Sequence, residues 1–108
     1  PTLYEAWHEV QPVVISAANA PRIRADVVGP VCETGDYLAQ DREMAQPKPG
    51  DLIAVGSAGA YGAVQAGTYN SRLLIPEVLV NGADFHVIRP RPSYDELIGL
   101  DSLPSWLS

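Results

Sequence analysis

The sequence predicts an all-β fold, either a β-sandwich or a Greek-key barrel-like domain, with one or two short helices. Its 108 residues include 9 glycines and 10 prolines, which interrupt long helices and favour short strands joined by turns. The apolar residues form short runs rich in β-branched side chains, and turn-forming residues separate these runs. A chain of this length matches one domain, so we expect residues 1–108 to form a single β-domain.

The first half of the chain is expected to hold four strands. Residues 10–16 (VQPVVIS) are rich in β-branched side chains, and Pro12 indicates an edge strand or a bulge. Residues 17–25 are small and polar and predict a loop. The other strands are expected over residues 26–32, 37–44 and 52–55.

The second half contains the clearest local signal, a β-hairpin. Its strands are expected over residues 76–82 and 84–89. The pair Asn81-Gly82 between the apolar runs is typical of a tight turn in which both residues have positive φ.

A short helix is expected after the hairpin, over residues 94–99. Ser93 followed by Glu96 has the spacing of a capping box, in which each residue bonds the backbone of the other. Gly99 is the expected end of this helix.

Composition and charge exclude several function classes. Seven basic residues against 13 acidic ones give a net charge of −6, so no basic surface for nucleic acid or an anionic membrane is expected. Cys32 is the only cysteine, which suits a reducing cytoplasm. Lys48 is the only lysine and lies between two prolines in a polar turn. Because the chain begins at Pro1 within an apolar-aromatic pattern, we expect it to be a piece of a longer polypeptide.

The most chemically suggestive segment is residues 29–36 (GPVCETGD). A lone cysteine beside a turn is most often a small buried apolar residue. The functional alternative is a proton donor, because the neighbouring carboxylates of Glu33 and Asp36 disfavour the thiolate and keep Cys32 as the neutral thiol.

Two further segments leave alternatives open. The glycine-rich residues 56–62 (GSAGAYG) can present backbone N–H groups and the Tyr61 hydroxyl to an anion, or form a simple connection between strands. Trp7 and His8 are most simply packing residues. The histidines have no cysteine or carboxylate partners at ligand spacing, so we expect no metal site.

Six pieces of the sequence, taken in order, resemble the C-terminal domain of the fold-type III pyridoxal-phosphate decarboxylases. They are residues 1–8 (PTLYEAWH), 28–36 (VGPVCETGD), 49–52 (PGDL), 58–61 (AGAY), 69–70 (YN) and 76–80 (PEVLV). Glu33 directly after the cysteine resembles the diaminopimelate branch more than the ornithine branch.

The resemblance implies a cytoplasmic lyase of lysine biosynthesis that converts meso-2,6-diaminopimelate to L-lysine and CO₂. It implies pyridoxal 5'-phosphate as the cofactor, bound in an N-terminal TIM-like barrel that this chain lacks. It also implies a homodimer whose active sites are shared between subunits. The Schiff-base lysine would lie outside these residues, so we expect the chain alone to be inactive.

The same resemblance implies roles for five residues. Cys32 would be catalytic and would reach into the partner subunit's site, close to the substrate Cα. Glu33 would bind the distal ammonium group of the substrate, and Thr34 stands where the family usually has serine. Tyr61 would contact the cofactor and its phosphate, and Tyr4 would lie near the substrate.

Two alternative functions remain open at this point. One is a pyridoxal-phosphate decarboxylase of another basic amino acid or a carboxylated polyamine. The other is a non-catalytic β-sandwich module that only binds partners.

Overall fold

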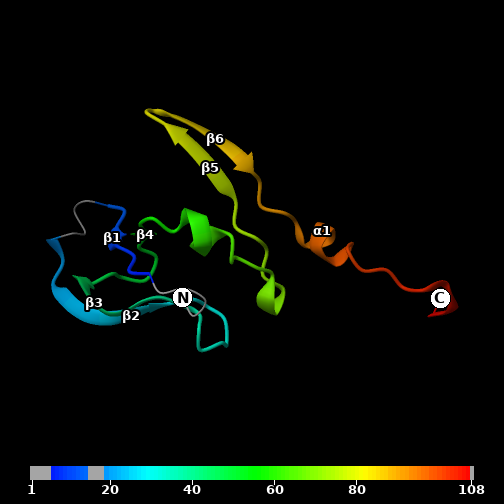
Figure 1. Cartoon of the computed structure of the whole chain (residues 1–108), viewed down its shortest axis with the longest axis horizontal. Coiled ribbons are helices and arrows are strands. Elements are labelled where there is room, and N and C mark those ends of the chain that lie inside the picture. Colours follow the sequence, from blue (N-terminus) through cyan, green and yellow to red (C-terminus); the bar gives the residue numbers. More distant parts are fainter. Residues whose placement is uncertain (1–5, 15–18, 108) are drawn as a thin grey trace. The chain divides into compact units, whose positions relative to one another are not determined.

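The computed structural model describes residues 6–14 and 19–107. Within this part of the chain the strands form three two-stranded antiparallel ladders, in which β1 pairs with β4, β2 with β3, and β5 with β6 (Figure 1). The strands are β1 Val10–Pro12, β2 Arg22–Val28, β3 Tyr37–Ala45, β4 Ile53–Val55, β5 Glu77–Asn81 and β6 Asp84–Arg89. The helical elements are η2 Gly59–Ala63, η3 Tyr69–Ser71, α1 Tyr94–Ile98 and η4 Ser105–Leu107. The predicted all-β class with few, short helices is confirmed.

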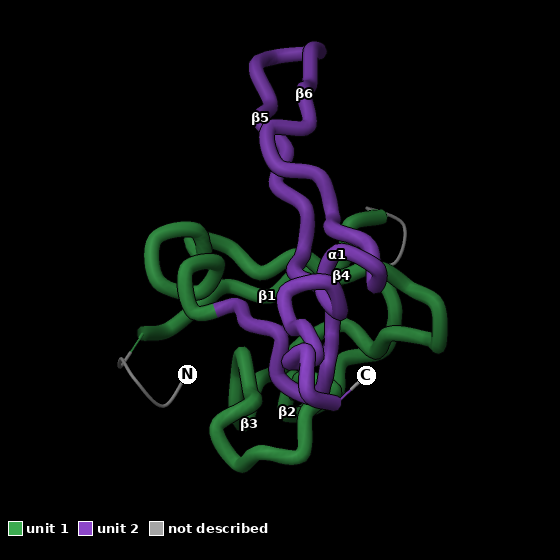
Figure 2. The backbone as a smooth tube through the Cα atoms, turned by 90° about the vertical axis from the view of Figure 1, so that its right-hand side faces the viewer, with its two compact units in different colours: residues 1–65 green, residues 66–108 purple. Residues whose placement is uncertain are grey.

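Contacts within the chain group it into two compact units, Pro1–Gln65 and Ala66–Ser108 (Figure 2). The first unit contains the core, which is built on Val27, Ala39 and Met44 from the β2–β3 ladder. Val10 of β1 and Ile53 of β4 pack against this cluster. The β1–β4 ladder therefore covers the β2–β3 ladder, as expected for sandwich-like packing. No helix in the described ranges is long and apolar enough to cross a membrane.

The strand β2 corrects one prediction and confirms its neighbour. The loop predicted over residues 17–25 is wrong from Arg22 onward, because β2 begins there. Its two arginines face solvent and form ion pairs across the ladder to β3, Arg22 with Glu43 and Arg24 with Asp41. Charged cross-strand pairs thus stabilise a stretch that composition alone assigns to a loop. The strand predicted over residues 37–44 is confirmed as β3.

The other predicted strands of this unit are shorter than expected. The strand expected over residues 10–16 extends only from Val10 to Pro12, and residues 15 and 16 lie outside the described residues. The strand expected over residues 26–32 ends at Val28. The strand expected over residues 52–55 is confirmed as β4.

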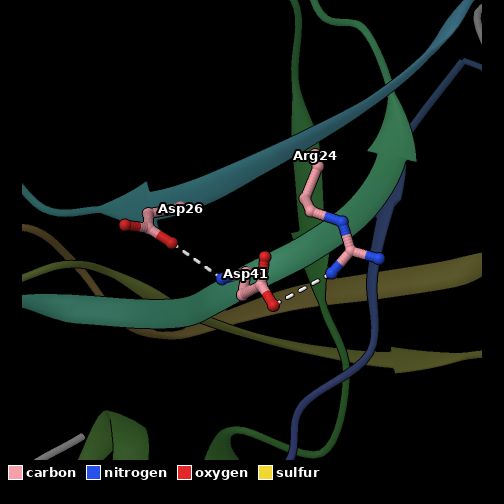
Figure 3. Close-up of polar contacts among 3 residues, drawn as sticks. All are labelled: Arg24, Asp26 and Asp41. Carbon is pink, nitrogen blue, oxygen red and sulfur yellow. Dashed lines mark hydrogen bonds and ion pairs between the residues drawn. The ribbon is translucent and has the colours of Figure 1, made fainter.

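A bulge interrupts the β2–β3 ladder between Ala25 and Val27. Asp41 lies there with φ of 49°, in the left-handed region, and its backbone N–H donates to Oδ1 of Asp26 (2.7 Å; Figure 3). Its own carboxylate accepts from Arg24 (2.9 Å). This ion pair raises the pKa of the Arg24 guanidinium. Local polar contacts thus hold a backbone conformation that few side chains adopt.

Asp41→Val is therefore expected to lower the Tm of the protein, and by more than Asp41→Asn. A β-branched side chain in the left-handed region costs about 1–3 kcal/mol, whereas asparagine tolerates it. Thermal unfolding of the two variants side by side checks this. Equal losses of Tm would mean that only the ion pair matters.

The second unit confirms the predicted hairpin and corrects its turn. Asn81 pairs with Asp84, so the loop consists of Gly82 and Ala83. Gly82 has φ of 62°, but Asn81 does not have a positive φ, contrary to the prediction. A positive φ at the first loop residue alone is the pattern of a type II′ turn, in which glycine is required there.

The capping box of α1 is confirmed. The backbone N–H of Glu96 donates to the Ser93 hydroxyl (3.1 Å), and the backbone N–H of Ser93 donates to the Glu96 carboxylate (2.6 Å). The helix ends before Gly99, as expected. The bond from the Ser93 backbone lowers the pKa of the Glu96 carboxyl.

This lowered pKa predicts an acid-sensitive helix start. The contribution of the Glu96 carboxylate is present above its unfolded pKa, about 4.3, and is lost as the pH falls through the lower folded value. The protection factors of the α1 amides, corrected for the intrinsic pH dependence of exchange, should therefore fall in acid in the wild-type protein but change less in Glu96→Gln. The same acid response in both proteins would contradict this assignment.

Apolar exposure is the dominant property of the second unit. None of its described residues, 66–107, is buried. The hairpin exposes apolar side chains on both of its faces, including Leu79, Val80 and Phe85, the last at 76%. An isolated two-stranded hairpin is marginally stable at best in water, so its exposed apolar faces indicate packing against another surface.

Candidate active-site loop

The predicted catalytic segment is the connection between β2 and β3, residues 29–36. Cys32, Glu33 and Thr34 follow one another in this loop, and all three are exposed. The structure therefore brings these three predicted residues together at one surface. The interpretation of Cys32 as a buried apolar residue is wrong, because the loop places the thiol at the surface of the domain.

Hydrogen bonds within the loop determine its shape. At its base, the backbone N–H of Gly29 donates to the Asp36 carbonyl (2.8 Å), which joins the two ends of the loop. The backbone N–H of Val31 donates to the Asp36 carboxylate (2.6 Å). Both bonds therefore join residues before Cys32 to a residue after Glu33.

The Glu33 carboxylate lies at the tip of the loop. One oxygen accepts from the backbone N–H of Gly35 (2.8 Å), and the other lies 3.4 Å from the Thr34 hydroxyl. Each carboxylate oxygen has a second acceptor position, so an ammonium group can bind the same carboxylate without breaking these bonds. The loop thus presents an exposed anion that is already oriented.

Tyr61 lies on a different segment, the π-helical turn η2 that follows β4. Tyr61 is 66% exposed. Nothing lies within 4 Å of where a side chain on Gly59 would begin, so the start of this turn is open to solvent. The glycine-rich segment is therefore part of the connection from β4 to β5, and it contains a helical turn on which Tyr61 is exposed.

The segment before β1 holds the other predicted residues. Tyr4 lies outside the described residues. His8 is buried, and its Nδ1 lies 3.0 Å from the carbonyl of Gly56, so His8 is a packing residue as expected. Trp7 is exposed, but one face of its ring is covered by the Arg42 guanidinium at 4.1 Å.

Arg42 makes two packing contacts that the sequence did not indicate. Besides stacking on Trp7, it donates to the carbonyl of His8. Both contacts fasten the segment leading into β1 to strand β3. The sequence pattern indicates only that an arginine in a strand faces solvent. Its contacts with Trp7 and His8 become evident only once the distant segments are packed together.

The residues present fit a pyridoxal-phosphate site in part. A thiol, a carboxylate and a phenol are groups that bind or protonate a substrate or contact a phosphate. The lysine needed for covalent attachment of the cofactor does not fit, because Lys48 is exposed and its backbone N–H is bonded to Asp51 in a tight turn. This chain therefore exposes groups of types that bind ligands, and its one lysine does not suit covalent attachment of the cofactor.

Comparison with known proteins places the chain among its relatives. The family described as pyridoxal-dependent decarboxylase, C-terminal sheet domain, matches residues 1–59. The diaminopimelate decarboxylase of Pseudomonas aeruginosa is 52% identical over 103 residues, covering 95% of this chain and 24% of that protein. The diaminopimelate decarboxylase of Zymomonas mobilis is 48% identical over 107 residues, covering 99% of this chain and 25% of that protein.

A solved structure extends the similarity to the fold of the whole chain. Diaminopimelate decarboxylase from M. jannaschii, crystallised in complex with L-lysine, superposes with a TM-score of 0.86 at 32% identity, covering 100% of this chain and 24% of that one. The chain thus spans about a quarter of the length of the relatives it matches. It belongs to the C-terminal sheet domain family of the pyridoxal-dependent decarboxylases.

Proposed function

We propose that the chain is the C-terminal β-domain of a diaminopimelate decarboxylase, which converts meso-2,6-diaminopimelate to L-lysine and CO₂ with pyridoxal 5'-phosphate. The observation that carries the proposal is the exposed loop between β2 and β3, which presents a thiol and a carboxylate side by side in a domain of this family. Relatives about half identical to the chain are named as this enzyme.

Cys32 is proposed as the proton donor. The bound cofactor acts as an electron sink when the bond between the substrate Cα and its carboxylate breaks. Cα then requires a proton, and Cys32 Sγ transfers its proton there, so that a C–H bond replaces the lost C–C bond. Water reprotonates the thiolate before the next turnover. A thiol suits this role because its S–H can donate a proton to a reacting carbon that faces it, and Cys32 is exposed on the loop.

Glu33 is proposed to bind the distal ammonium group of the substrate. An ammonium–carboxylate hydrogen bond is charge-assisted, and the bond from Gly35 already orients this carboxylate. Thr34 adds a hydroxyl beside it. Together they select a substrate with a second amino group at its far end.

Tyr61 and Tyr4 are proposed as ligand contacts at the edge of the site. The exposed Tyr61 phenol can donate a hydrogen bond to the cofactor phosphate in its own subunit. Tyr4 is proposed near the substrate on the strength of the resemblance alone, since it lies outside the described residues.

A larger assembly is part of the proposal. A TIM-like barrel would provide the cofactor lysine, and Cys32 and Glu33 would enter the site of a partner subunit in a cytoplasmic homodimer. The exposure of Cys32, Glu33 and Thr34 supports this, since closing an active site with a second surface excludes water from the reacting groups. The absence of any buried side chain among the described residues of the second unit supports it too.

A substrate panel on the full-length protein tests the proposed function. With pyridoxal 5'-phosphate present, meso-diaminopimelate should release CO₂ and yield L-lysine, with a kcat/KM at least about 100-fold above ornithine, arginine and carboxynorspermidine. A preference for one of the others would keep the reaction but replace the substrate. No CO₂ from any of them would refute the proposal. The 108-residue chain alone, as a control, should release none.

A further inference from the structure

Asp36 lies where the candidate loop returns to strand β3, and its carboxylate turns back over the start of the loop. Oδ2 accepts from the backbone N–H of Val31 (2.6 Å), a short bond of the kind that charged acceptors form. The Asp36 carbonyl accepts from Gly29 (2.8 Å), and the Asp36 N–H donates to the Glu33 carbonyl (3.1 Å). One residue therefore bonds the backbone at three positions of a loop only eight residues long.

Gly29 leaves the space that this carboxylate occupies. A Cβ built on Gly29 would lie 2.1 Å from Oδ1 of Asp36 and 2.3 Å from Oδ2, distances that no real side chain shows. Gly29 has no positive φ, so backbone conformation does not demand glycine there. Close approach of the Asp36 carboxylate demands it instead.

We propose that Asp36 is a positioning residue for the decarboxylation, and that Gly29 is the position that admits its carboxylate. Holding the Val31 amide fixes the backbone directly before Cys32, and holding the Glu33 carbonyl fixes it directly after. Asp36 thus fixes the positions of the Cys32 thiol and the Glu33 carboxylate together. This inference rests on the proposed function.

Positioning has a measurable consequence. Displacement of a catalytic group by about 1 Å can cost about 100-fold in rate. Asp36→Ala is expected to lower kcat about 10- to 100-fold and also to raise KM, since the thiol and the carboxylate lose their placement together. Asp36→Asn retains one oxygen that can accept from the Val31 N–H, so it should restore most of the lost activity.

A double-mutant cycle separates positioning from general damage. If Asp36 acts through Cys32, then Asp36→Ala should lower kcat no further in a Cys32→Ala enzyme. Asp51→Ala is the matched control, because Asp51 also accepts from a backbone N–H in a turn of the same unit (Lys48, 2.8 Å) but lies outside the loop. It should leave kcat and KM unchanged. Multiplicative effects of Asp36→Ala and Cys32→Ala, or an equal loss in Asp51→Ala, would overturn the proposal.

Gly29→Ala provides a second route that keeps Asp36. It should reduce kcat as Asp36→Ala does, and the double variant should be no worse than either single one, because removing the carboxylate vacates the space for Cβ. If Asp36→Ala fails to fold, the cycle with Cys32 is run with Gly29→Ala instead. Multiplicative effects of Gly29→Ala and Cys32→Ala on kcat would then overturn the proposal.

Amide hydrogen exchange tests Asp36 independently of activity. In the full-length protein the Val31 amide should lose protection in Asp36→Ala and keep it in Asp51→Ala. Unchanged protection would refute the role of Asp36 whatever the activity. A wild-type protein that decarboxylates nothing while the Val31 amide depends on Asp36 would instead refute the proposed function and leave Asp36 as a purely structural anchor.

Discussion

Cys32→Ala is expected to lower the kcat of the full-length protein by about 100-fold or more, with the KM for diaminopimelate within about twofold of the wild-type value. In the proposed mechanism Cys32 contacts the substrate only when Cα takes up its proton, so its loss affects the rate and not ground-state binding. Steady-state kinetics of CO₂ release, with L-lysine quantified in parallel, measures both constants.

Cys32→Ser serves as the matched variant for this prediction. The hydroxyl is of similar size but a much weaker acid, so its kcat should lie between those of the wild type and Cys32→Ala. A Cys32→Ala enzyme with wild-type kcat would eliminate the thiol as the donor. A rise in KM without a fall in kcat would instead make Cys32 a binding residue.

Glu33→Gln is expected to raise the KM for diaminopimelate about 10- to 100-fold with a smaller change in kcat. A hydrogen bond to a charged group contributes about 1.5–3 kcal/mol, and the neutral amide retains the shape of the side chain but loses the charge. The bond from the Gly35 N–H can persist to the amide oxygen, so the loop itself should stay in place. The effect should therefore report on the substrate ammonium.

Glu43→Gln is the control for this prediction. Glu43 is an exposed glutamate of the same unit that pairs with Arg22 on the β2–β3 ladder, away from the loop. Its replacement should leave KM unchanged, because the Arg22–Glu43 pair lies outside the loop. An unchanged KM in Glu33→Gln, or an equal rise in both variants, would count against the ammonium contact.

Local signals in the sequence predicted the fold where short-range physics decides it. The capping box of Ser93 and Glu96 and the β5–β6 hairpin depend on residues within a few positions of one another, and both are confirmed. The start of β2 was missed because the strand character of Arg22 and Arg24 depends on acidic partners in β3. The turn type was missed because the pairing of Asn81 with Asp84 moves glycine to the first loop position.

The reactive groups of the candidate site could be predicted from the sequence. The residues that hold its backbone in place could not. Cys32, Glu33 and Thr34 are adjacent in sequence, so any loop that exposes one exposes its neighbours. The hydrogen bond from the Val31 N–H to the Asp36 carboxylate depends on how the loop folds back. The spacing of these residues in the sequence does not predict it. Arg42 reaches a segment 34 residues earlier, and only the packing of β1 on β3 brings the two together.

The central claim is that this domain completes an active site in a partner subunit, and mixed dimers test it most directly. Cys32→Ala subunits are combined with subunits that lack the cofactor-binding lysine of the barrel, each inactive alone, and CO₂ release from diaminopimelate is measured. If Cys32 acts in the partner's site, each mixed dimer has one site with both groups intact, so random mixing of equal amounts should restore about a quarter of wild-type activity. Activity no greater than that of the two parents, with exchange of subunits verified, would contradict the claim.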